Sequence, residues 1–145
     1  MLANGLKGGS EKMLTEKLKT LSSSPVWEHI GLELKFAENG KSKVFMPAKN
    51  EFLQVFGNIH GGILATLLDA TMAAALNSVL NENTFSVTAE MKIQFLKSAS
   101  GNHLTGVGEV VKHGKTLTVC KSEIYDQDDQ VVAFATGTFV NKVKT

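Results

Sequence analysis

The chain has 145 residues, enough for one domain with a sizeable core, and its net charge is only +1. All 15 basic residues are lysines, so the balanced charge and the absence of arginine argue against nucleic acid as the main partner. The single Cys120 excludes an internal disulfide and fits a reducing compartment. No segment reaches the roughly 20 apolar residues of a membrane span, and the start lacks a secretory signal. We therefore expect a soluble, cytoplasmic protein.

The chain is expected to begin with an N-terminal extension, residues 1–24, that carries a helix. Ser10 is a possible N-cap for that helix, which would reach about Leu21. The single main domain is expected to span residues 25–145. Its first element is a short helical turn that starts at Ser24-Pro25, because serine at the N-cap and proline after it are typical of helix starts.

Two strands, 32–38 and 41–47, are predicted to form a hairpin around Asn39-Gly40, a strong type I′ turn signal. An unusually apolar loop, 48–58, follows them, and we expect it to pack against another part of the molecule. A long, almost entirely apolar helix is then predicted from about Gly61 to Val79.

After this helix the hydrophobic period changes to two, which is typical of half-buried strands. Four strands are predicted, at residues 87–95, 104–111, 116–125 and 131–140. Short turns between consecutive strands indicate an antiparallel sheet, and the long helix must cover its apolar face. The expected fold class is therefore α+β.

The central helix carries one acidic residue, Asp69, and nothing else between Ile63 and Leu76 is ionisable. A carboxylate buried in such a helix has to be hydrogen-bonded, paired or functional. A structural role, with a bond to Thr66, Asn77 or a neighbouring loop, is one interpretation. Catalysis as a base or nucleophile is the other.

The glycines of His60-Gly61-Gly62 would let a ligand approach the backbone N–H groups at the start of the helix, where partial negative charge is favoured. A carbonyl that becomes an oxyanion suits that position. Gly61 and Asp69 are eight residues apart, which is roughly 12 Å along a helix, too far to serve one small reacting centre. Two helices packed antiparallel about a two-fold axis could supply both groups, so the motif predicts a symmetric dimer.

Residues 25–140 resemble the hotdog-fold acyl-CoA thioesterases, in particular their phenylacetate-pathway (PaaI-like) branch. The resemblance depends on the motif 60–62, on its spacing to Asp69, and on the later run 112–117, KHGKTL. It implies a sheet wrapped around a long helix, a homodimer with a continuous sheet, and often a dimer of dimers (homotetramer). It also implies hydrolysis of acyl-CoA, with coenzyme A as part of the substrate and no further cofactor.

The resemblance assigns catalysis to five positions. Asp69 would be the general base or nucleophile, and the Gly61 N–H would bind the thioester carbonyl. Gln54 would lie near the carbonyl or the attacking water, Thr88 would orient that water, and His60 would shape the loop.

Substrate binding is expected from a second group of residues, which comprises Gly62, Phe56, Asn58, Lys112 and Lys115. The two lysines would meet the nucleotide phosphates of coenzyme A, unless they are only surface charges. The acyl pocket would be lined by the loop 52–56 and the facing helix. Some relatives carry a threonine one turn after the acid, where this chain has Ala73.

Other motifs fail. The run 114–116 lacks the glycine and the following helix of a phosphate-binding loop, and the acidic turn 126–130 lacks the glycine and glutamate of a calcium loop. No histidine has a partner at metal-ligand spacing, so no metal is expected. Two other functions stay open, a hotdog protein that binds acyl-CoA without turnover and, as a less favoured alternative, a hotdog dehydratase or hydratase.

Overall fold

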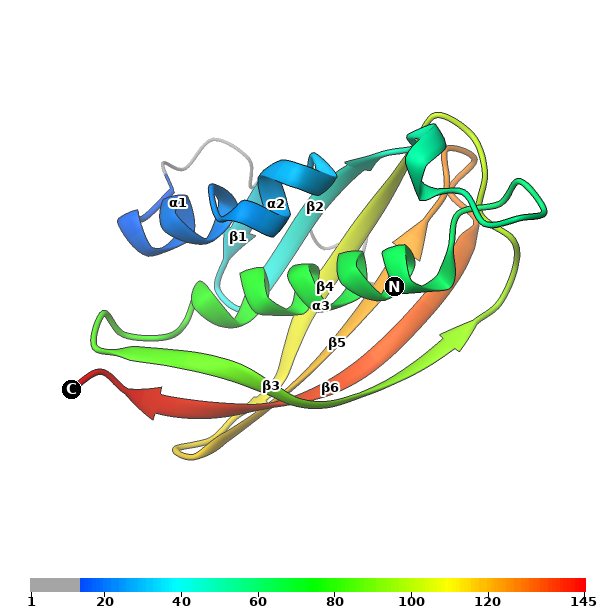
Figure 1. Ribbon diagram of the computed structural model, residues 1–145. Helices are drawn as coiled ribbons and strands as arrows, with labels where there is room; N and C mark the ends of the chain where they lie inside the picture. Colours follow the sequence, from blue (N-terminus) through cyan, green and yellow to red (C-terminus); the bar gives the residue numbers. More distant parts are fainter. Residues whose placement is uncertain (1–13) are drawn as a thin grey trace.

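The computed structural model describes residues 14–145, in which an antiparallel sheet curls around one long helix, α3 (Figure 1). The elements in chain order are α1 (Glu16–Ser22), α2 (Pro25–Ile30), β1 (Glu33–Glu38), β2 (Lys41–Pro47), η2 (Asn50–Phe52), α3 (Gly61–Asn77), β3 (Thr84–Phe95), β4 (His103–His113), β5 (Leu117–Tyr125) and β6 (Val131–Val143). The strand order β1-β2-β4-β5-β6-β3 places β3 at one edge of the sheet. The α+β hotdog fold expected from the sequence is confirmed.

Close contact between α3 and the sheet fixes which side of the helix faces outward. A Cβ atom on Gly108 would lie 2.6 Å from the Thr71 carbonyl oxygen, so β4 can approach the helix this closely only with glycine there. Ser42 Oγ donates to the same carbonyl at 2.6 Å, and Ser122 Oγ donates to the Leu68 carbonyl at 3.1 Å. Because the strands hold this buried side of α3, the opposite side is left for other contacts.

The short turns follow the sequence signals closely. Asn39 and Gly40 have φ angles of 52° and 78°, which is the left-handed pair that a type I′ turn requires. Helix α2 starts at Pro25 and ends before Gly31, whose φ of 85° is the left-handed conformation that glycine adopts without strain. Trp27 is buried in the core, as expected for so large an apolar side chain.

The start of α1 differs from the prediction. The helix begins at Glu16, because the Thr15 side chain caps it by accepting a bond from the Leu18 N–H at 3.2 Å. Ser10, the predicted cap, lies outside the described residues. Lys17 Nζ then donates to the backbone carbonyls of Asn81 and Thr84, which ties α1 to the loop after α3.

A β-bulge in β3 determines which face of the sheet Thr88 occupies. Simple alternation would place Thr88 on the face of the sheet away from the helix. In the structure Thr88 pairs with buried Phe139 and Glu90 pairs with Thr138, so Ala89 is an extra residue between them. The bulge therefore turns Thr88 toward the helix, on the same face as Met91.

Candidate active site

His60 is the N-cap of α3. Its Nδ1 atom accepts a hydrogen bond from the Gly62 N–H at 2.8 Å, and its own N–H donates to the Phe52 carbonyl at 2.7 Å. An Nδ1 atom that accepts a hydrogen bond carries no proton. His60 therefore caps and shapes the start of the helix.

Gly61 is the first helical residue, and its N–H has no hydrogen-bond partner among residues 14–145. The first N–H groups of a helix lack partners within it and carry the positive end of the helix dipole. Gly61 also lines a cavity of about 290 Å³, whose other lining residues are Gln54, Asn58, Ile59, Leu64, Phe95, Leu96, Lys97, Ser98 and Ala99. A free donor therefore lies at the wall of a cavity.

The Gln54 side chain has a fixed orientation beside Gly61. Its Oε1 atom accepts hydrogen bonds from the Phe56 N–H at 2.5 Å and the Asn58 N–H at 3.3 Å. Because both acceptor positions of the amide oxygen are used, only the Nε2 group remains, and that group donates. Gln54 thus suits a carbonyl oxygen as its ligand.

Asp69 lies on the side of α3 that faces β3. Thr88 Oγ1 donates to its Oδ1 atom at 2.8 Å, across the gap between helix and strand. Burial raises the pKa of the Asp69 carboxyl above its usual value, and the bond from Thr88 partly opposes that rise by stabilising the anion. The result is a half-buried carboxylate with one hydroxyl partner.

The partners considered for a purely structural Asp69 are occupied elsewhere. Thr66 Oγ1 donates to the Gly62 carbonyl at 3.0 Å, and Asn77 Nδ2 donates to the Ala73 carbonyl at 2.8 Å. Within residues 14–145, Asp69 has no hydrogen-bond partner other than Thr88. The structure therefore brings together Asp69 and Thr88, two of the five residues predicted for catalysis.

Two groups predicted to act together are separate within one chain. Asp69 does not line the cavity at Gly61, and eight helical residues, roughly 12 Å, lie between them.

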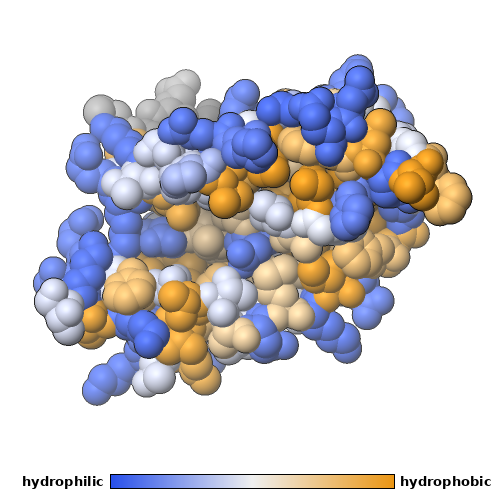
Figure 2. Space-filling model, in the orientation of Figure 1, coloured by the Kyte–Doolittle hydropathy of each residue, from blue (hydrophilic) through white to orange (hydrophobic). Residues whose placement is uncertain are grey.

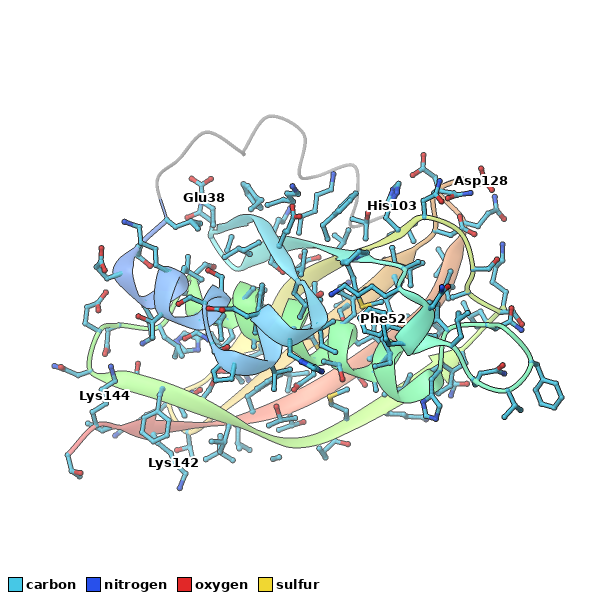
Figure 3. The ribbon with its side chains drawn as sticks, turned by 45° about the horizontal axis from the view of Figure 1, so that its top comes forward. Glu38, Phe52, His103, Asp128, Lys142 and Lys144 are labelled. Atoms are coloured by element: carbon cyan, nitrogen blue, oxygen red, sulfur yellow. The ribbon has the colours of Figure 1, made fainter. Side chains whose placement is uncertain are left out.

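Phe56, which was expected to bind substrate, does not line the cavity either. It is 83% exposed in the loop before α3. Phe52 instead lies in the core beside α3 (Figure 3). Apolar side chains gather on the surface at this end of the molecule (Figure 2).

Lys112, near the end of β4, and Lys115, in the turn between β4 and β5, are both exposed. Lys115 lines a second cavity, of about 310 Å³, together with residues 79–81 beyond the last turn of α3. This is the opposite end of the helix from Gly61. Lys142 and Lys144 lie toward the same end of the sheet (Figure 3).

The sequence did not point to the residues after β3 that line the cavity at Gly61. Lys97 is one of these residues, and its Nζ atom is 2.9 Å from Asp126 Oδ2. Hydrogen bonds from the Gln130 N–H and from Lys97 lower the pKa of the Asp126 carboxyl. The pair fastens the cavity wall to the β5–β6 turn. No signal in the sequence couples these two distant residues.

The fold corresponds to one class of protein, the hotdog thioesterases. Residues 56–133 match the thioesterase superfamily, and the chain belongs to this family.

Among residues 14–145, no cluster of three or more His, Cys, Asp or Glu side chains could hold a metal ion. No helix in the same range has the length and apolar character of a membrane span.

Three relatives show the extent of the similarity. A thioesterase family protein of Silicibacter pomeroyi has a TM-score of 0.84 at 30% identity, with 88% of this chain and 97% of that one covered. The PaaI protein of the E. coli phenylacetic acid degradation operon has a TM-score of 0.81 at 24% identity, with 92% and 99% covered. A 1,4-dihydroxy-2-naphthoyl-CoA hydrolase of Listeria monocytogenes is 28% identical over 119 residues, 81% of this chain and 95% of that protein.

Proposed function

We propose that this protein hydrolyses acyl-CoA thioesters. The observation that carries the proposal is Asp69, a half-buried carboxylate on an otherwise uncharged helix, with a raised pKa and a single hydroxyl donor. A carboxylate whose pKa is raised above its usual value is a stronger general base than an ordinary surface acid. Membership of the thioesterase superfamily supports the same reaction class.

In the proposed reaction the thioester carbonyl accepts hydrogen bonds from the Gly61 N–H and the Gln54 amide. Asp69 takes a proton from water, and the hydroxide attacks the carbonyl carbon. The carbon–sulfur bond then breaks, the acid is released, and the coenzyme A thiolate takes up a proton. Direct attack by Asp69, through a mixed anhydride that water then hydrolyses, is the other form of the same proposal.

The reaction requires a second subunit in this proposal. Because Gly61 and Asp69 are too far apart on one helix, Gly61 of one chain would act with the partner's Asp69. The free edge of β3 supports such a dimer, since an exposed edge strand twelve residues long offers its unpaired N–H and C=O groups to another strand. A two-fold axis at this edge yields two identical shared sites. Association of two dimers into a tetramer remains part of the proposal.

The same pairing gives Lys112 and Lys115 a role. Antiparallel β3 strands bring the start of one strand beside the end of the other. The partner's β4–β5 turn would therefore lie toward this chain's Gly61. From there its two exposed lysines can meet the phosphates of coenzyme A, as point charges rather than bidentate ligands.

Asp69→Asn tests the proposal because it removes the base and keeps the shape of the side chain. Hydrolysis of aryl- and fatty-acyl-CoA, followed with a thiol-detecting reagent, should fall by about 10²- to 10⁴-fold. Asp128→Asn removes an acid from an exposed hairpin turn and should leave the rate unchanged. Near wild-type hydrolysis by Asp69→Asn would exclude Asp69 as the catalytic group. Tight binding of acyl-CoA that is recovered intact from the wild type would favour a binding protein instead.

A further inference from the structure

Phe95 is the last residue of β3, and its ring lies against the start of α3. A Cβ atom placed on Gly61 would be 3.4 Å from Phe95 Cζ and 3.5 Å from Cε1, and its three nearest neighbours all belong to this ring. Phe95 faces the helix side of the sheet, since it pairs with buried Ala133. The ring is therefore the group that a side chain at Gly61 would meet first, and it lies beside the start of α3.

The cavity beside this ring has a mixed lining, in which an apolar floor lies next to the polar residues Gln54, Asn58, Lys97 and Ser98, and one side is half-open. Ile59, Leu64 and Ala99 form buried parts of its wall, each no more than 4% exposed, whereas Phe95 and Leu96 are each 54% exposed. Apolar side chains exposed at the mouth of a cavity occur both on ligand-binding surfaces and at subunit contacts, and in the proposed dimer the end of β3 would serve both. The volume of about 290 Å³ lies at the lower end of the roughly 300–1,000 Å³ range of small-ligand pockets, which suits a compact acyl group.

These observations deepen the proposed thioesterase function and depend on it. We propose that Phe95 determines the acyl specificity, because its ring forms the side wall of the cavity next to the reacting carbonyl. The apolar floor takes the acyl group, and the polar pantetheine arm extends toward solvent. Compact acyl groups, aryl or short-chain, fill the space between the ring and the floor. A long chain has to pass the ring and is disfavoured.

The expected effect follows from hydrophobic pockets in general, where a single methylene changes kcat/KM about 10- to 200-fold between substrates. Phe95→Ala removes the wall and opens the cavity toward the adjacent surface. The ratio of kcat/KM for a long-chain substrate to that for a compact one should then rise by about tenfold or more.

The experiment measures kcat/KM for phenylacetyl-, butanoyl-, octanoyl- and palmitoyl-CoA with the wild type, Phe95→Ala and Phe134→Ala. Phe134 is a matched control, because it is a half-exposed phenylalanine on the neighbouring strand β6, on the opposite face of the sheet. We expect Phe95→Ala to shift the preference toward octanoyl and palmitoyl groups, and Phe134→Ala to keep the wild-type order.

An equal loss on all four substrates in Phe95→Ala would overturn the inference, since it would indicate a structural role only. If Phe95→Ala does not fold, Phe95→Leu keeps an apolar side chain and allows the same comparison. Absence of hydrolysis by the wild type on every substrate would instead contradict the proposed function itself. The two failures are therefore distinguishable.

Discussion

At the scale of single residues, burial and the hydrogen bond from Thr88 act in opposite directions on the pKa of Asp69. Burial raises the pKa of this carboxyl, and the Thr88 hydroxyl opposes the rise by donating to the anion. Thr88→Val keeps the size of the side chain but removes the donor, so the pKa of Asp69 should rise further. A general base works only when ionised, so activity is lost as the pH falls through this pKa. The acid limb of the kcat/KM profile should therefore move to higher pH in the variant.

Thr88→Ser is the control for this prediction, because it retains the hydroxyl and should keep the acid limb at the wild-type pH. Measurement of kcat/KM between acidic and neutral pH for the three proteins separates the possible roles of Thr88. A lower plateau with an unmoved limb would show that Thr88 orients water without setting the charge of Asp69.

The sequence singled out Asp69 and Gly61 as candidates because a carboxylate is unusual in an apolar helix and a glycine at the helix start leaves the backbone N–H open to a ligand. It could not establish that Thr88 contacts Asp69, since alternation along β3 places Thr88 on the other face. The contact depends on the bulge at Ala89, and such an extra residue is defined by pairing with a distant strand. The orientation of the Gln54 amide is similarly decided by two backbone N–H groups.

At the scale of elements, Gly61 is the first residue of α3. A substitution by proline at this position can therefore remove the backbone N–H and still leave the helix intact. Proline is favoured at this position because its fixed φ suits a helix start and its missing N–H is not needed there. His60 has φ −61° and ψ 137°, the extended conformation that precedes proline readily. If this N–H stabilises an oxyanion, Gly61→Pro should lower kcat by about 10²- to 10³-fold.

Gly61→Ala is the matched control, since alanine keeps the N–H and its Cβ atom would meet Phe95 at an ordinary contact distance of 3.4 Å. It should retain far more activity than Gly61→Pro on a compact substrate, with both proteins unfolding at similar temperatures. Equal kcat values for the alanine and proline variants would show that the N–H takes no part in the reaction.

Elements with strong local signals were predicted well. Pro25 with Gly31 defined α2, and Asn39-Gly40 defined the first hairpin, because capping and turn chemistry act over a few residues. The loop before α3 was harder to predict. Its apolar composition suggested packing throughout, but only Phe52 is in the core, whereas Val55 and Phe56 are 91% and 83% exposed. Composition does not show which side of a loop an apolar side chain will occupy.

At the scale of the whole molecule, the strand order determines where a partner can bind. The sequence predicted an antiparallel sheet on a helix, but not that β3, the strand after α3, would pair with β6 at the far edge. That pairing joins segments about forty residues or more apart, and local patterns carry no information on it. It leaves β3 with one open edge beside Asp69, where the proposed dimer would form.

A mixture of two inactive variants tests this dimer directly. Gly61→Pro lacks the carbonyl donor and Asp69→Asn lacks the base, so each homodimer should be inactive. In a mixed dimer, the intact Gly61 of the Asp69→Asn chain faces the intact Asp69 of the Gly61→Pro chain, and one of the two sites is complete. Co-expression in equal amounts should restore about a quarter of the wild-type activity, because half of the dimers are mixed and each has one working site.

The control for the mixing experiment combines both substitutions in one chain and co-expresses it with the wild type. In those mixed dimers, each shared site pairs one intact group with one lost group, so they should contribute no activity. If each site instead used Gly61 and Asp69 of the same chain, the two single variants would stay inactive together. The wild-type subunit of the control would then keep its full activity in mixed dimers. A site shared between two chains and a site within one chain therefore predict opposite results in both experiments. The comparison works with any acyl-CoA that the wild type hydrolyses, so the natural acyl group need not be known.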